Sequence, residues 1–225
     1  MKSHISDQQR QELEQVAAQQ HQSKPDRATE LARLIQQQRR NGFCGPDGKV
    51  RWHLSQADTL LMRGLVRLFG ENAQWLPEYD EVASWLSDNQ GKGLFLIGDC
   101  GRGKTVITQQ IFPVLFQYYM RRTDGSRMAY NCTTAKALAD NYDEFSRYKI
   151  LCIDDIGTEG KVRKFGNVRD YVEDLVDVAE KEQKLLVLST NLTFDQLQQR
   201  YDMRTIDRLR GLTTRVFFEG QSLRQ

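Results

Sequence analysis

The eight residues "GDCGRGKT" limit the folds open to this chain more than any other stretch of it. They fit the spacing G-x-x-x-x-G-K-[ST], in which glycines let backbone N–H groups converge on an anion. In this pattern Lys104 reaches the β- and γ-phosphates of a nucleotide, and the Thr105 hydroxyl ligates Mg²⁺. The alternative is a glycine turn that merely precedes a lysine. The residues predicted to bind the phosphates are Gly98, Asp99, Cys100, Gly101, Arg102, Gly103, Lys104 and Thr105.

The segments on either side of these eight residues favour the phosphate loop. "GLFLIG", residues 93–98, is a short apolar run typical of a buried strand. Residues 104–120 place apolar side chains at helical spacing, with Pro113 predicted to kink the helix. A strand, a loop and a helix in this order are what a phosphate loop requires. We therefore predict nucleotide binding.

Beyond the loop, short apolar runs alternate with helical patterns. The predicted strands cover residues 126–132, 148–157, 184–191 and 214–220, and the predicted helices cover residues 133–145, 168–183 and 193–201. Strands separated by helices imply a parallel sheet with both faces covered. The predicted fold class is α/β.

Two carboxylates follow the second of these strands. Ile150 to Ile153 is the apolar run, and Asp154 and Asp155 come directly after it, at the edge where α/β sheets place ligands. We expect Asp154 to hold Mg²⁺ through water and Asp155 to orient or deprotonate the attacking water. A helix cap or a turn is the alternative for the pair. In the wider class of phosphate-loop proteins, glutamate is commoner at the second of these two acidic positions. Asp155 is one methylene shorter than glutamate, so we expect slow hydrolysis.

A polar amide ends the next strand. Asn191 follows "LLVLST" and could contact the γ-phosphate or the attacking water. Its alternative role is to cap the helix that begins near Thr193, which is itself a predicted cap.

The composition divides the chain into two regions. Residues 1–50 are predicted to form a helical or partly disordered arm and loop that docks a partner, with helices at Asp7–Gln20 and Pro25–Arg40. Residues 1 to about 42 are rich in glutamine, and the alternative for them is a partly disordered tail. Residues 51–225 are predicted to form the nucleotide-binding domain. No apolar run reaches the roughly 20 residues of a membrane span, and the start lacks the apolar core of a signal peptide, so we expect a cytoplasmic protein without a membrane partner.

Net charge and cysteine spacing say less about whether the chain binds nucleic acid or metal. The net charge of +2 does not by itself indicate a nucleic-acid binder, although the basic residues gather in two clusters. These clusters are Lys161, Arg163, Lys164 and Arg169, and Arg204, Arg208, Arg210 and Arg215. The cysteines lack metal-ligand spacing and are expected to be free thiols: Cys44, Cys100, Cys132 and Cys152.

Four motifs together resemble a known family. "GDCGRGKT", "CIDDIGTE", "LSTNLT" and "RYDMRTIDRLRG", in this order, are similar to the AAA+ ATPases of the DnaC/IstB type, which include helicase loaders and transposition helper ATPases. The resemblance covers about residues 75–225. It implies a P-loop NTPase core of the AAA+ kind, with a central five-stranded parallel sheet flanked by helices and no sizeable C-terminal lid.

The same resemblance assigns further residues. It puts Asn191 at the sensor-1 position and matches Arg204 and Arg208 to an R-x-x-x-R motif. The second arginine of this motif is the finger that completes the site of a neighbouring subunit, which implies a homo-oligomer formed on ATP binding. The motif usually reads tyrosine-glycine before its arginines, whereas this chain has Tyr201 and Asp202.

These features predict a Mg²⁺-dependent, oligomer-dependent ATPase. The leading hypothesis is a loader of a replicative helicase that binds single-stranded DNA, although the segment before the Asp154 strand is shorter than the one that contributes to DNA binding in relatives. The alternative is a helper of a transposase, and residues 1–50 match nothing that would identify the partner. A small metabolite kinase has no use for Asp154, Asp155, Asn191 and Arg208 in this order. A non-hydrolysing ATP-gated binding module stays open because position 155 is not glutamate.

Overall fold

The structure is a computed structural model that describes residues 47–123, 130–160, 162–164 and 167–223. The chain divides into two units, Met1–Arg40 and Asn41–Gln225, and all the described residues belong to the second. The helices predicted at residues 7–20 and 25–40 lie outside the described residues, so they and the domain boundary at residue 50 stay predictions.

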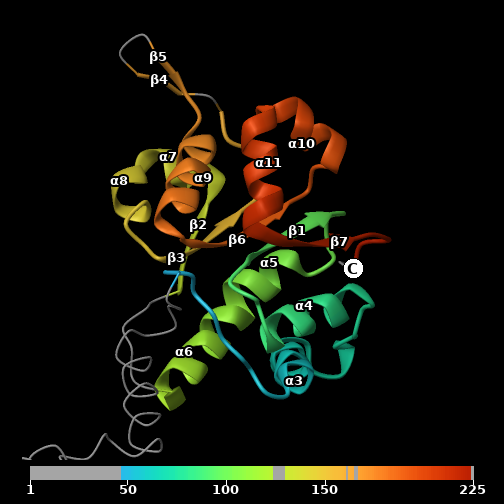
Figure 1. The fold of residues 1–225 in the computed structure, drawn as a ribbon. Helices are drawn as coiled ribbons and strands as arrows, with labels where there is room; N and C mark the ends of the chain where they lie inside the picture. The colour runs from blue at the N-terminus through green and yellow to red at the C-terminus, as the bar shows by residue number, and fades with distance from the viewer. Residues whose placement is uncertain (1–46, 124–129, 161, 165–166, 224–225) are drawn as a thin grey trace, which may run out of the picture. The chain divides into compact units, whose positions relative to one another are not determined.

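A five-stranded parallel sheet forms the centre of the described unit (Figure 1). Its strand order is β2-β3-β6-β1-β7, so the strand that leads into the phosphate loop lies between β6 and an edge strand. Leu94 of β1 pairs with Val187 of β6, and Phe95 of β1 pairs with Arg215 of β7. The strands are β1 (Gly93–Gly98), β2 (Tyr130–Thr134), β3 (Ile150–Asp154), β6 (Leu185–Thr190) and β7 (Thr213–Phe218). This sheet confirms the predicted fold class.

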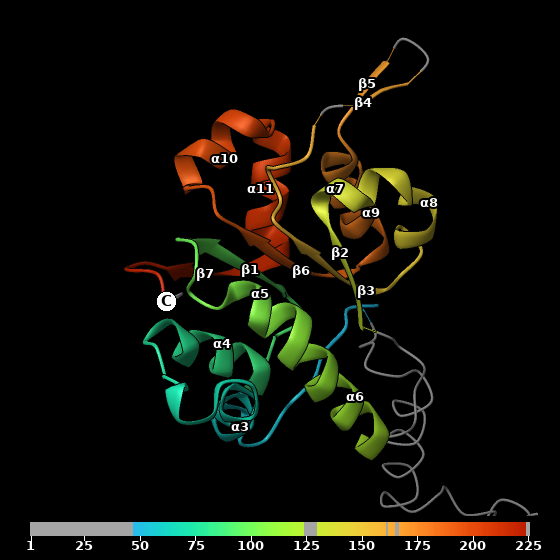
Figure 2. The same ribbon diagram turned by 180° about the vertical axis from the view of Figure 1, so that it is seen from behind.

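Helices cover both faces of this sheet (Figures 1 and 2). One face carries α3 (Ala57–Phe69), α4 (Glu78–Ser87), α5 (Lys104–Val106) and α6 (Phe112–Thr123). The other face carries α7 (Ala135–Asp140), α8 (Tyr142–Phe145), α9 (Tyr171–Glu182), α10 (Phe194–Arg200) and α11 (Met203–Leu212). Among the described residues no helix is both long enough and apolar enough to cross a bilayer.

Side-chain alternation along the strands produces two buried cores. In β1, Leu94 and Leu96 pack into the core beneath α3, α4 and α6, whereas Phe95 and Ile97 pack into the core beneath α7, α9 and α11. Successive side chains of a strand point to opposite faces of the sheet, so a continuous apolar run is what two covered faces require. The sheet is thereby a rigid support for the loops at its carboxyl edge.

The helix after the phosphate loop contains a π-helical segment, Ile107–Ile111, between α5 and α6. Pro113 has no N–H to donate, so the Thr108 carbonyl loses the partner that the π pattern would give it. The Tyr130 hydroxyl donates to this carbonyl instead, at 2.8 Å. The irregularity predicted at Pro113 therefore lies in the turn before it and is stabilised from β2.

Two predicted helices differ from the observed ones. Residues 133–145 form α7 and α8 with a break at Asn141, instead of one helix. The helix predicted over residues 168–183 begins only at Tyr171, because β5 (Asn167–Arg169) pairs antiparallel with β4 (Val162–Lys164). The Asp170 carboxylate then accepts hydrogen bonds from the first N–H groups of α9 and fixes its start. The β4–β5 hairpin projects away from the sheet in both views (Figures 1 and 2).

Candidate functional site

The predicted phosphate loop joins β1 to α5. Gly103 has a φ of +90°, and a Cβ at this position would lie 2.6 Å from the Tyr79 hydroxyl oxygen, so both the conformation and the space require glycine. The Tyr79 hydroxyl donates to the Arg102 carbonyl at 3.0 Å, and burial raises the pKa of Tyr79 to about 12. Because this hydroxyl stays protonated at neutral pH, α4 holds the loop through an uncharged donor.

The Lys104 ammonium group lies inside this loop. Only 5% of the residue is exposed, and its Nζ donates to the carbonyl oxygens of Gly98 at 2.8 Å and Asp99 at 2.7 Å. Burial lowers the pKa of Lys104, against the opposing effect of nearby acidic groups that include Asp155 and Asp154. A cation held at the centre of a loop rich in left-handed glycines is the arrangement that receives nucleotide phosphates.

The Thr105 hydroxyl donates to the Asp154 carboxylate, with oxygen–oxygen distances of 3.0 and 3.3 Å. The Ser189 hydroxyl, from the neighbouring strand β6, also donates to Asp154. Asp154 is buried, so the hydroxyl donors replace the water that its carboxylate has lost. Hard oxygen ligands at one edge of a sheet, beside a phosphate loop, fit Mg²⁺ bound partly by phosphate and water.

Asp155 and Asn191 contact each other at the same edge. The Asn191 amide donates to the Asp155 carboxylate at 2.8 Å, and the Ser189 hydroxyl accepts from the Asp155 N–H at 3.1 Å. Asp155 has a φ of +57°, a left-handed conformation that non-glycine residues adopt at some cost and often at functional sites. The alternative role of Asn191 as a helix cap is not observed, because Thr193 caps α10 in a capping box with Gln196.

A buried ionic network behind these residues was not predicted from the sequence. Glu159, in the loop after β3, accepts from the Arg200 guanidinium at 3.0 Å and from the Tyr201 hydroxyl. Arg200 also pairs with Asp170 at 2.6 Å, and Asp170 caps α9. The network ties the loop that carries Asp155 to the start of α9 and the end of α10. Acidic and basic residues far apart in sequence gave no local pattern from which this pairing could have been found.

The two arginines predicted for a neighbouring subunit differ in their surroundings. Arg208 of α11 pairs with Asp177 and, at 2.6 Å through Nε, with Glu180, both from α9. Arg204 is exposed, one turn earlier on α11. The described chain therefore shows Arg208 in intramolecular ion pairs, and its action on another subunit stays a prediction.

Of the cysteines, Cys100 is exposed in the phosphate loop, and Cys132 and Cys152 are free thiols on adjacent strands. Cys44 lies outside the described residues. The side chains of the first basic cluster, residues 161–169, are likewise outside the description.

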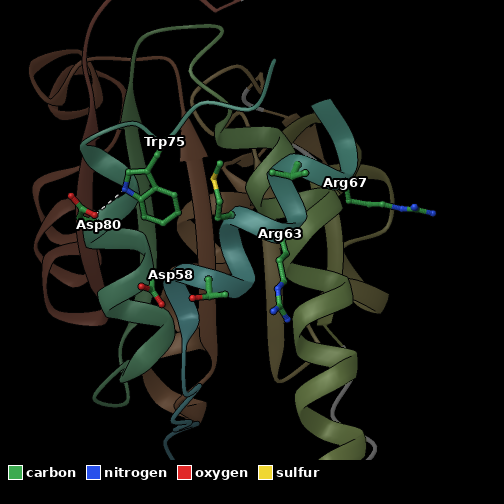
Figure 3. Close-up of a pocket in the computed structure, with 8 residues that line it drawn as sticks. Asp58, Arg63, Arg67, Trp75 and Asp80 are labelled. Atoms are coloured by element: carbon green, nitrogen blue, oxygen red, sulfur yellow. Dashed lines mark hydrogen bonds between the residues drawn. The ribbon is translucent and has the colours of Figure 1, made fainter. Parts of the chain in front are cut away.

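A separate hollow of about 670 Å³ lies along α3 (Figure 3). Trp75 forms one wall, and its indole N–H donates to Asp80 at 2.9 Å. The lining residues are Asp58, Thr59, Met62, Arg63, Val66, Arg67, Trp75 and Asp80. None of the predicted site residues is among them, so this hollow is distinct from the phosphate loop.

No protein-family model matches the chain, and no curated protein matches it. Solved structures do match. A protein described as a primosome component from Streptococcus pyogenes is 17% identical, with 76% of this chain and 88% of that chain covered and a TM-score of 0.44. A DnaC helicase loader is 17% identical, with 80% and 99% covered and a TM-score of 0.43. DnaI is 19% identical, with 76% and 86% covered and a TM-score of 0.40.

Of these descriptions, that of DnaC names a member of the group that the four motifs resemble. At this identity the likeness concerns the fold alone.

Proposed function

We propose that the chain is a Mg²⁺-dependent ATPase of the AAA+ kind. The observation that carries this proposal is the meeting of three segments at one edge of the sheet: Thr105 contacts Asp154, and Asp155 contacts Asn191. A loop that only turned the chain would not need a buried lysine, a buried carboxylate and a polar amide in this arrangement.

Each residue has a distinct task in this proposal. The N–H groups of the loop and Lys104 bind the phosphates, while Thr105 and Asp154 hold Mg²⁺, which supplies charge neutralisation at the β- and γ-phosphates. Asp155 accepts a proton from the attacking water or orients it, and Asn191 fixes the Asp155 carboxylate. Ser189 positions both aspartates, since it donates to one and accepts from the N–H of the other.

We further propose that this ATPase is a cytoplasmic loader of a replicative helicase that binds single-stranded DNA and assembles with copies of itself. The order of the four motifs and the exposed Arg204 on α11 support this choice. Because the same motifs occur in helpers of transposases, that function is the second candidate.

The test is the rate of phosphate release from Mg²⁺·ATP by the full chain, with and without single-stranded DNA. Turnover without a phosphate acceptor, increased by DNA, supports the proposal and excludes a metabolite kinase. Binding of ATP with no turnover under either condition supports a non-hydrolysing binding module instead. A pull-down from a host lysate with the full chain, and with a chain lacking residues 1–40, separates a helicase partner from a transposase.

A further inference from the structure

The segment after β7, residues 219–223, lies beside the loop between β1 and α5 (Figures 1 and 2). The Gly220 N–H donates to the Asp99 carboxylate at 2.9 Å, and the Leu223 N–H donates to the Gly101 carbonyl at 3.0 Å. At the last residue of β7, the Phe218 carbonyl accepts from the Asp99 N–H at 2.7 Å. Main-chain groups of the C-terminal segment thus hold two positions of the phosphate loop.

Side chains hold the same two segments together. Arg102 of the loop reaches the Gln221 carbonyl at 3.4 Å and forms a buried ion pair with Glu78 of α4 at 2.6 Å. Gly101 has a φ of +76°, and a Cβ at this position would lie 2.0 Å from the Ser222 hydroxyl oxygen. The C-terminal segment therefore packs directly over the left-handed turn of the loop.

This packing has a consequence for phosphate binding. A phosphate loop binds an anion through backbone N–H groups that converge on one point. The left-handed glycines that allow this convergence can also adopt many other conformations. Contacts that hold the loop in its binding conformation before nucleotide arrives reduce the loss of conformational entropy on binding. Residues 219–223 restrict the half of the loop that α5 does not hold.

We propose that residues 219–223 form a strap that positions the phosphate loop for nucleotide, with Asp99 as the positioning residue that connects loop and strap. This inference rests on the proposed nucleotide binding. Asp99 occupies a variable position of the loop motif, so the phosphate-binding function of the motif does not itself require a carboxylate there. Its carboxylate instead accepts the Gly220 N–H and anchors the strap.

The test compares the full chain with Asp99→Ala, a chain lacking residues 219–225, and the combination of both. Asp99→Ala should weaken Mg²⁺·ATP binding by about ten-fold, as expected for a lost hydrogen bond to a charged group. The shortened chain should lose at least as much, because it also lacks the Leu223 and Gln221 contacts to the loop. The combination should be no weaker than the shortened chain, because the two changes remove one shared contact. The KM for ATP should rise by a larger factor than kcat falls, since Asp155 and Asn191 are untouched.

The exposed Asp143→Ala is the matched control and should bind ATP as the full chain does. Additive losses in the combination, or tighter binding by the shortened chain, would overturn the strap. Hydrogen exchange of residues 98–105 without nucleotide separates this inference from the proposed function. Faster exchange in both variants supports the strap even if the full chain binds no ATP, and unchanged exchange contradicts it.

Discussion

At the scale of single residues, the site depends on which polar groups meet at the carboxyl edge of the sheet. Asp154 and Asp155 are adjacent in sequence but differ in environment, since Asp154 is buried against Thr105 and Ser189 whereas Asp155 is half-buried and contacts Asn191. Carboxylates with different partners can take different roles in one reaction. This difference supports the proposal that Asp154 binds Mg²⁺ and that Asp155 orients or deprotonates the attacking water.

Asp155→Asn should retain Mg²⁺·ATP binding and lose most of the turnover. An amide can still hydrogen-bond, but it cannot accept the proton of the attacking water, and this loss is felt mainly in the transition state. Calorimetry measures the binding, and phosphate release measures the turnover. The control is Asp143→Asn, an exposed aspartate of α8. Hydrolysis by Asp155→Asn at the parental rate would place the base elsewhere.

The half-buried Arg200 and its two buried partners lead to a prediction about stability. Arg200→Ala leaves Glu159 and Asp170 buried without their cation, and removal of one partner from a buried pair costs about 3 kcal/mol or more. Tyr201→Phe removes only one hydrogen bond to the Glu159 carboxylate and should cost about 1.5 kcal/mol, less than Arg200→Ala. Urea unfolding measures both, with the exposed Arg147→Ala as the control. Equal losses for Arg147→Ala and Arg200→Ala would show that the network contributes nothing specific.

At the scale of elements, the central strands could be predicted because they are continuous apolar runs next to turn residues. The phosphate loop could also be predicted, because its motif requires a strand before it and a helix after it. The breaks in regular structure could not be predicted so well. The start of α9 depends on the pairing of β4 with β5, and the turn before Pro113 depends on the Tyr130 hydroxyl, which belongs to another strand.

The candidate site shows the same division. Lys104, Thr105, Asp154, Asp155 and Asn191 could be proposed from the sequence because each follows a strand or completes a motif, and the structure places them at one edge of the sheet. Ser189 could have been found as well, since it lies two residues before Asn191 at the end of β6. Glu78, Glu159 and the strap could not, because their contacts join segments separated by 24 to 121 residues in the chain.

The β4–β5 hairpin carries a prediction about DNA. Lys161, Arg163, Lys164 and Arg169 are expected to contact phosphates, because no acidic residue occurs in residues 161–169. Binding of single-stranded DNA should then weaken steeply with salt as counterions are released, and Arg163→Ala with Lys164→Ala should reduce the salt slope by about 1 to 2. Fluorescence anisotropy at several salt concentrations measures this slope. An affinity that does not change with ionic strength, or a preference for duplex DNA, would contradict this prediction.

At the scale of the whole molecule, the question is whether one chain contains the complete site. Arg208 is paired with Asp177 and Glu180 of its own chain, so its action on a neighbour requires these pairs to open or rearrange. We predict that Lys104→Ala and Arg208→Ala are each inactive alone and that their mixture recovers part of the activity. In the mixture the Arg208 of one variant faces the intact phosphate loop of the other, and such a finger contributes on the order of 10³-fold to hydrolysis.

Phosphate release by the mixture measures this recovery, and light scattering verifies that the two variants assemble together. A mixture that assembles and stays inactive would contradict the predicted finger. Full turnover by Arg208→Ala alone would contradict it as well, and Arg204→Ala then becomes the variant to pair with Lys104→Ala.

The central claim is that the loop at residues 98–105 binds the phosphates of ATP through Lys104. Calorimetric titration of Mg²⁺·ATP into the full chain and into Lys104→Ala tests this claim most directly, with the exposed Lys136→Ala as the control and circular dichroism to verify the fold. We predict binding by the full chain and by Lys136→Ala, and no measurable binding by Lys104→Ala, because the cation inside the loop is lost. Equal affinity of Lys104→Ala and the full chain would contradict the account.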